Sequence, residues 1–167
     1  MKKVLPILVS LFMVIVIAMI FVSMAKEDGP ITIVTGNMEM KPLPIDINHT
    51  NDTQCAMLIK TIYNTAQAVA PDGRTWFFDD PGCLVLWIEE RPFKDEAKLW
   101  VHTIDTNKWI DAKEAHYGIT DRSMMHYGFG SRENKTDKTI GYDEMRLRML
   151  RGENLTDPKI RKKLLGI

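Results

Sequence analysis

The sequence has few cysteines, no net charge and none of the common catalytic motifs. It contains two cysteines, Cys55 and Cys83, and its 22 basic residues balance 22 acidic ones. Nucleic-acid binding needs a basic face, and nothing in this charge balance indicates one, so we expect no nucleic-acid partner. Neither a Gly-x-Ser-x-Gly nucleophile elbow nor a His-Glu-x-x-His zinc helix is present. The sequence therefore predicts a binding protein rather than an enzyme.

Charged residues are also missing from most of the N-terminal region. Lys2 and Lys3 precede an uncharged apolar run from Val4 to Ala25, and roughly 20 such residues span a bilayer as a helix. The two lysines favour a cytoplasmic N-terminus. Residues 1–25 thus predict a signal anchor at the inner membrane, with a single N-terminal span and the C-terminal domain in the periplasm. The alternative is a signal peptide cleaved after Ser23–Ala25, which would release a periplasmic protein.

Beyond this run the composition shifts towards proline, asparagine and threonine, and apolar periodicity is weak. Residues 26–51 are therefore predicted to be a tether. Residues 52–167 are enough for one domain or two very small ones. Within this domain we predict two halves, at about 52–93 and 97–167.

Both halves show the same order of elements. In the first, TAQAVA and RTWFF flank the turn sequence PDG. DDPGCLVLWIEER then follows with helical spacing, and Asp80 is a suitable N-cap before a proline. In the second, KLWVHTI and KWIDA flank the turn DTNK. DAKEAHYG then predicts a helix from Asp111 to Gly118, and MMHYGFGS predicts a strand. Two further helices are predicted from IGYDEMRLRMLRG and DPKIRKKLL. The fold class is predicted to be α+β, with two small ββα-type units of antiparallel strands after an N-terminal transmembrane helix.

The two cysteines allow two interpretations. In an oxidising compartment the default is a structural disulfide between Cys55 and Cys83. Alternatively, Cys83 falls at about the third position of the helix that Asp80 begins, where backbone N–H groups and the helix dipole favour a thiolate. Thiolates and thioethers are soft ligands that select Cu(I). Spacing alone leaves both interpretations open.

Three other residues supply further soft or borderline donors. Met57 is two residues from Cys55, so on a regular strand both side chains face the same side. Met125 and His126 offer a thioether and an imidazole in a glycine-flanked segment that can approach a neighbouring loop closely. Taken singly, Met125 is more typical of core packing and His126 of a surface position.

The order of these motifs resembles a known family. CAM, AQAVAPDGRTWFFDDPGCLVLW, WVHTIDTNKWIDAKEAHY and MMHYGFGS, within about residues 52–131, resemble the NosL family of exported copper-chaperone accessory proteins for nitrous oxide reductase. The resemblance implies a pair of small ββα-type units that bind Cu(I). It also implies delivery of copper for the copper–sulfide site, to apo nitrous oxide reductase or through its copper-loading membrane complex.

The resemblance also assigns candidate ligands. Cys55 and Met57 match the family's Cys-Gly-Met motif, with Ala56 in the glycine place. Met125 matches a methionine late in the domain, and Cys83 matches a cysteine found in many members. From these matches we expect Cys55 to be a primary metal ligand and Cys83 to supplement it.

The chain departs from the family pattern in two places. Asp52 stands where many members have a second cysteine, which weakens any local dithiol site. The usual lipoprotein cysteine is missing as well. A different function therefore stays open at this point: a structural or redox thiol module with a Cys55–Cys83 disulfide and no metal.

Overall fold

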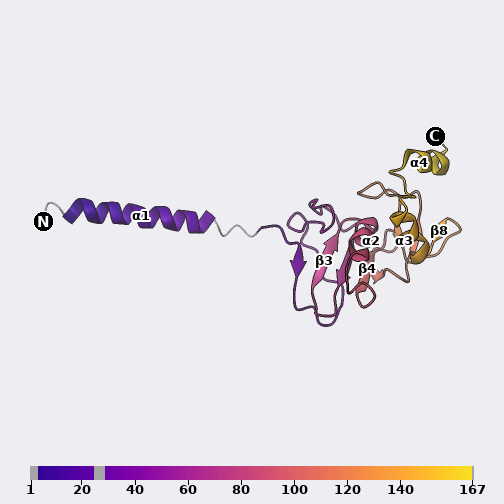
Figure 1. Ribbon diagram of the computed structural model, residues 1–167, viewed down its shortest axis with the longest axis horizontal. Helices are drawn as coiled ribbons and strands as arrows, with labels where there is room; N and C mark the ends of the chain where they lie inside the picture. The colour runs from indigo at the N-terminus through magenta and orange to yellow at the C-terminus, as the bar shows by residue number, and fades with distance from the viewer. Residues whose placement is uncertain (1–3, 25–28, 167) are drawn as a thin grey trace.

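The computed structural model describes residues 4–24 and 29–166, and Figure 1 shows how they are arranged. The strands are β1 (Ile33–Val34), β2 (Ala66–Val69), β3 (Thr75–Phe78), β4 (Lys98–His102), β5 (Trp109–Asp111), β6 (His116–Gly118), β7 (Ser131–Arg132) and β8 (Thr139–Ile140). The helices are α1 (Val4–Met24), α2 (Pro81–Glu89), α3 (Tyr142–Leu150) and α4 (Pro158–Leu165). Helices and strands occur together, as the predicted α+β class requires.

The prediction of a transmembrane helix is wrong. Within residues 4–24 and 29–166, no helix is long and apolar enough to cross a membrane. The predicted inner-membrane localisation depended on this single N-terminal span, so that prediction is wrong as well. Lys2 and Lys3, on which the predicted orientation depended, lie outside the described residues.

The larger sheet has five antiparallel strands in the order β1-β3-β2-β4-β5. β2 and β3 form the hairpin predicted from PDG, and the turn is closed by hydrogen bonds between Ala70 and Arg74 and between Gly73 and Ala70. β2 is buried along its length, so its other edge also needs hydrogen-bond partners. β4 supplies them. Strands of the predicted second half therefore complete the sheet of the first.

The segment from β1 to β2 packs along the larger sheet. β1 pairs with β3 at the sheet edge, and the buried Gln67 side chain exchanges two hydrogen bonds with the backbone of Leu43. Trp100 donates its indole N–H to the carbonyl of Met40. These contacts place the chain between β1 and β2 against the strands that hold the core.

The smaller sheet has the order β7-β6-β8. Its central strand β6 lies where a helix from Asp111 to Gly118 was predicted, and that prediction is wrong. Tyr117 pairs with Ser131 on one side and with Ile140 on the other, and these non-local pairings override the local helix signals. MMHYGFGS is likewise irregular, and pairing begins only at Ser131.

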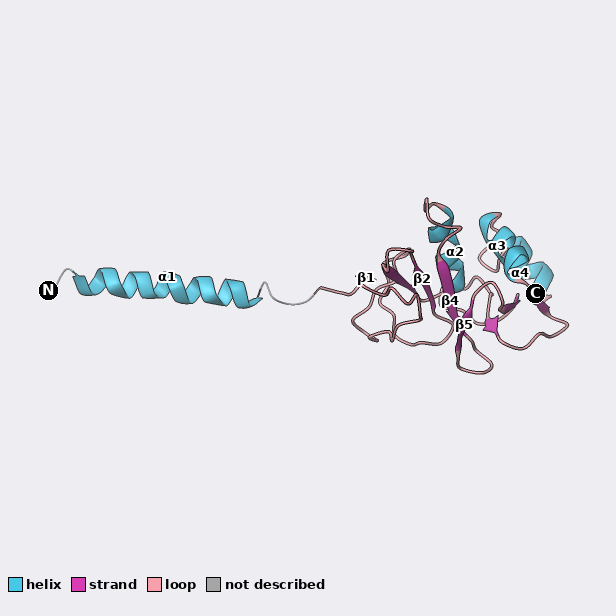
Figure 2. Cartoon of the chain, turned by 90° about the horizontal axis from the view of Figure 1, so that it is seen from below, coloured by secondary structure: helices cyan, strands magenta, loops and turns pink. Residues whose placement is uncertain are grey.

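The helices after α1 begin and end close to the predicted residues. Asp80 caps α2 and accepts a hydrogen bond from the Gly82 N–H, with Pro81 as the first helical residue. Asp157 caps α4 in the same manner. Figure 2 shows α2 and α3 beside each other on one side of the strands, where they are in contact.

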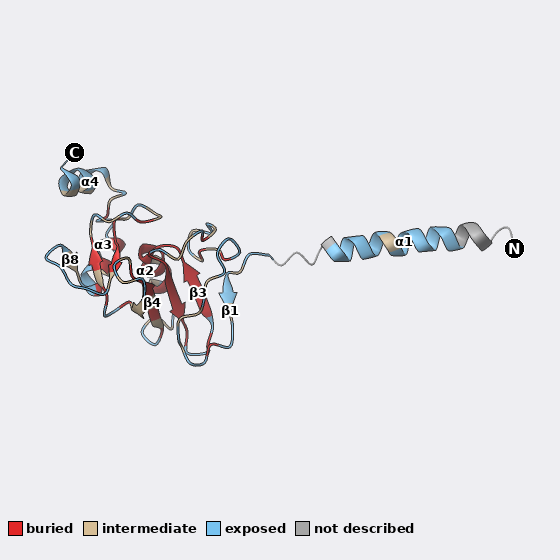
Figure 3. Cartoon of the chain, turned by 180° about the vertical axis from the view of Figure 1, so that it is seen from behind, coloured by how far each residue is buried: buried red, intermediate tan, exposed pale blue. Residues whose placement is uncertain are grey.

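One hydrophobic core lies between these helices and the two sheets. It includes Phe78 of β3, Leu84 and Trp87 of α2, and Tyr117 of β6. Figure 3 shows the buried residues concentrated on α2, β3 and β4, with β1 and α4 at the exposed periphery. The beginning of α2, where the candidate site lies, is thus held by the centre of the core.

Candidate metal centre

The loop 52–57 carries Cys55 in a tight turn. The Asp52 N–H donates to the Met57 carbonyl at 2.7 Å, and the Ala56 N–H donates to the Asp52 carbonyl at 2.9 Å. Ala56 has a φ of 61°, so the predicted strand alternation does not apply here. Cys55 packs against the core, whereas the Met57 side chain is 42% exposed.

The backbone at Ala56 is left-handed, a conformation that glycine adopts without strain. An L-residue there costs roughly 1–2 kcal/mol, which glycine avoids. Because Ala56 is exposed, Ala56→Gly removes no core contact. We expect it to unfold at the same temperature as the parent or a higher one, while Ala56→Val melts lower. Thermal melts of the three proteins test this, and a clear loss of stability in the glycine variant would contradict the strain argument.

The second half of the site is the junction of β3 and α2. Asp80 accepts hydrogen bonds from the N–H of Gly82 at 2.8 Å and of Met125 at 3.2 Å. The helix cap therefore also holds the segment that carries Met125. Cys83 lies in the first turn of α2, is fully buried, and places its Sγ 4.0 Å from Oδ1 of Asp79.

Four donor atoms meet between the loop and this junction. They belong to Asp52, Cys55, Asp79 and Cys83 and lie within 4.8 Å of one another. Metal–thiolate bonds are about 2.3 Å long, so one ion between these atoms would need only small movements. Both cysteines are free thiols. The group could hold a metal ion.

Sequence reasoning found the two cysteines of this group and missed its two carboxylates. In the sequence, Asp52 stands out only as a departure from the family pattern, and Asp79 has no predicted role. Their positions offered a signal: Asp52 precedes Cys55 by three residues and Asp79 precedes Cys83 by four. In a turn and a first helical turn, those spacings bring side chains together.

Both thiols are harder to ionise than ordinary cysteines. Burial raises the pKa of Cys55 to about 11, and the nearby carboxylates of Asp52 and Asp79 add to the effect. Burial and the surrounding carboxylates raise the pKa of Cys83 even further. The thiolate predicted at the start of α2 is therefore not favoured in the metal-free protein, because desolvation outweighs the helix dipole.

Asp79 is a buried carboxyl group with an unpartnered oxygen. Its Oδ2 has no hydrogen-bond partner, and only 2% of the residue is exposed. Burial, followed by a side-chain hydrogen bond with Asp52 and then the charge of that carboxylate, raises the pKa of Asp79 from 3.8 to about 8. At neutral pH the group is therefore mostly an uncharged acid, and a cation arriving beside it would displace its proton.

We expect Asp79→Asn to stabilise the metal-free protein in alkaline solution. The pKa of Asp79 is higher in the folded state than in the unfolded state, so its contribution to stability is complete below about pH 4. That contribution is lost as the pH rises through about 8. The amide cannot ionise, and the variant should melt at least about 2–4 °C higher than the parent at pH 8. At pH 5 the difference should be smaller. Thermal melts of the variant and the parent at both pH values measure this difference. An equal rise in melting temperature at pH 5 and pH 8 would show that ionisation of Asp79 is not its cause.

Two other predicted ligands, Met125 and His126, lie on the segment that Asp80 holds through the Met125 N–H. Met125 is half-buried and packs against the core beside the capped start of α2. His126 is exposed, with a φ of 58°, and lines a hollow with Arg161 and Leu165. Its ring nitrogens are not part of the four-donor group.

The chain matches no model of a known protein family, and no curated protein matches it. The resemblance to NosL therefore rests on the sequence motifs alone.

Proposed function

We propose that the protein binds one Cu(I) between Cys55 and Cys83 and acts as a copper chaperone. The observation that supports this most strongly is the meeting of two free thiols, 28 residues apart in the chain, in one group of donors. Two soft thiolates satisfy Cu(I), which selects such ligands. Under this proposal two thioethers supply sulfur to an incoming or departing ion: Met57 in the Cys55 loop, and Met125, whose backbone N–H donates to Asp80 at the start of α2.

The delivery role rests on the family resemblance. Under this proposal the protein supplies copper for the copper–sulfide site of apo nitrous oxide reductase, directly or through the complex that loads it. The exposed Met57 side chain suits such a role, because a ligand at the surface offers the ion a first contact outside the buried thiols.

A second candidate function is supported by the same proximity. The two sulfur atoms lie within 4.8 Å of each other, and an oxidant that closed them to the roughly 2.05 Å of a disulfide would make a structural or redox thiol module. Free-thiol counts on protein purified without reductant separate the candidates. Two free thiols favour the metal site, and none favours the module.

Competition between metals tests the proposal. The reduced protein should bind one Cu(I) far more tightly than Zn(II), because a pair of sulfur ligands suits the softer ion. The measurement is an anaerobic titration of each metal against a chelator of known affinity. Zn(II) binding as tight as Cu(I) binding would show that the two carboxylates complete a tetrahedral site for a divalent ion instead.

A further inference from the structure

We infer that Asp52 is the positioning residue of the thiol site and not one of its ligands. This inference rests on the proposed function. It starts from the three backbone N–H groups that the Asp52 carboxylate already accepts. Oδ1 accepts from Gln54 at 2.7 Å and from Cys55 at 2.9 Å, and Oδ2 accepts from Asp79 at 2.8 Å.

These hydrogen bonds use most of the acceptor capacity of the carboxylate. An ionised carboxylate offers about four lone-pair positions, and hydrogen bonds to an ionised acceptor are the strong ones. The bond from Asp79 is buried and Asp79 is 2% exposed, so its N–H would find no water to replace Asp52. A metal ion that bound the Asp52 carboxylate would have to compete with these three hydrogen bonds.

The three donors belong to the two segments that carry the thiols. Gln54 and Cys55 lie in the loop, and Asp79 lies at the junction before α2. One further backbone bond supports the same contact, from the Thr53 N–H to the Phe77 carbonyl of β3 at 2.9 Å. Asp52 thereby fixes the Cys55 loop against the segment that leads into Cys83.

Asp79 differs from Asp52 because its Oδ2 has no partner. It is therefore the carboxylate of the group that is free to approach an ion. The inferred site has two sulfur ligands, with Asp79 as the available oxygen and Asp52 as the support that sets their spacing. Residues in such supporting positions typically change metal affinity about 10–100-fold when they are replaced.

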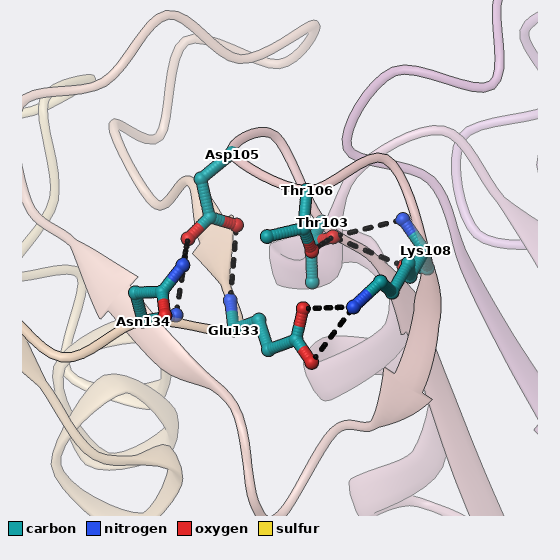
Figure 4. A network of polar contacts seen from close by, with 6 residues as sticks. All are labelled: Thr103, Asp105, Thr106, Lys108, Glu133 and Asn134. Atoms are coloured by element: carbon teal, nitrogen blue, oxygen red, sulfur yellow. Dashed lines mark hydrogen bonds and ion pairs between the residues drawn. The ribbon is translucent and has the colours of Figure 1, made fainter.

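Asp105 provides a matched control elsewhere in the fold. Its carboxylate accepts from the N–H groups of Glu133 and Asn134, each at 3.0 Å. Figure 4 shows it beside the ion pair of Lys108 and Glu133. Asp105 thus supports two consecutive backbone donors, as Asp52 does, but in a loop that carries neither cysteine. Asp105→Asn reproduces the chemical change outside the thiol site.

The first test compares Asp52→Asn with Asp105→Asn in the full chain. An amide has one acceptor oxygen, so Asp52→Asn cannot satisfy all three donors. We expect its Cu(I) affinity to fall about 10–100-fold and Cys55 in the metal-free protein to react faster with iodoacetamide. Asp105→Asn should change neither. Unaltered affinity and alkylation in Asp52→Asn would overturn the inference.

The second test uses the unaltered protein and does not depend on whether a variant folds. Amide hydrogen exchange at Cys55 and Asp79 reports whether Asp52 still holds them. Both amides should stay protected with and without Cu(I). Loss of their protection on copper binding would show that Asp52 leaves them to become a ligand. If the parent protein binds no Cu(I) at all, the proposed function fails, while the alkylation comparison still tests the positioning role.

Discussion

Replacing either cysteine by serine should remove most of the Cu(I) affinity. Both sulfurs lie in the same four-donor group, and serine exchanges a soft thiolate for a hard, protonated hydroxyl. We expect Cys55→Ser and Cys83→Ser each to lower the affinity at least 100-fold, more than the roughly 10–100-fold typical of supporting residues. This prediction gives Cys83 the role of a full ligand, in place of the supplementary role expected from the sequence. Anaerobic chelator competition measures the change.

Methionine variants provide the comparison for this result. Met57→Leu keeps the volume and apolar character of the side chain but removes the thioether, so its loss of affinity should be smaller. Met38→Leu, exposed in the connection between β1 and β2, should have no effect. Equal affinities in the parent and both serine variants would place the copper elsewhere. Matched losses of about 2–4 kcal/mol in stability from both serine variants, with no free thiols in the parent, would favour the disulfide module.

Cu(I) affinity should rise steeply with pH. The pKa of Cys55 is about 11 and that of Cys83 is higher, so near pH 7 both thiols are protonated and each must lose its proton to bind the ion. Two displaced protons raise the affinity by about a hundredfold for each pH unit. The pKa of Asp79, about 8, allows a third proton to leave below that pH if its carboxylate binds too.

Titrations at pH 6, 7 and 8, corrected for protonation of the chelator, measure this slope. Asp79→Asn separates the contributions, because the amide has no proton to release and the slope should then be that of the two thiols alone. An affinity that is flat over this range would mean that the thiols are already ionised, contrary to the effect of their burial.

Local signals predicted the elements that local interactions determine. α2 follows from the cap at Asp80 with the proline after it, and the hairpin of β2 and β3 follows from a turn sequence. The pairing of β4 with β2, across a helix, has no local signal. Asp111 and Gly118 carried genuine helix signals, yet hydrogen bonds to two distant strands make a strand of the segment before Gly118.

The residues of the candidate site also differ in whether the sequence could predict them. Cys55 and Cys83 were predicted as a pair because cysteine chemistry is visible in any sequence. Asp52 and Asp79 were missed because carboxylates are rarely buried, and only the three-dimensional structure shows that the interior holds them beside the thiols. Met57 was placed on a strand face, and the left-handed conformation of Ala56 moves it to the surface instead.

X-ray absorption at the copper edge of the reduced protein, loaded with one equivalent of Cu(I), tests the central claim most directly. The account predicts a shell of two sulfur atoms around the copper, because thiolates are the soft ligands that Cu(I) selects. It also predicts that both Cys55 and Cys83 become resistant to alkylation. A shell of nitrogen or oxygen alone, with both thiols still open to alkylation, would contradict it.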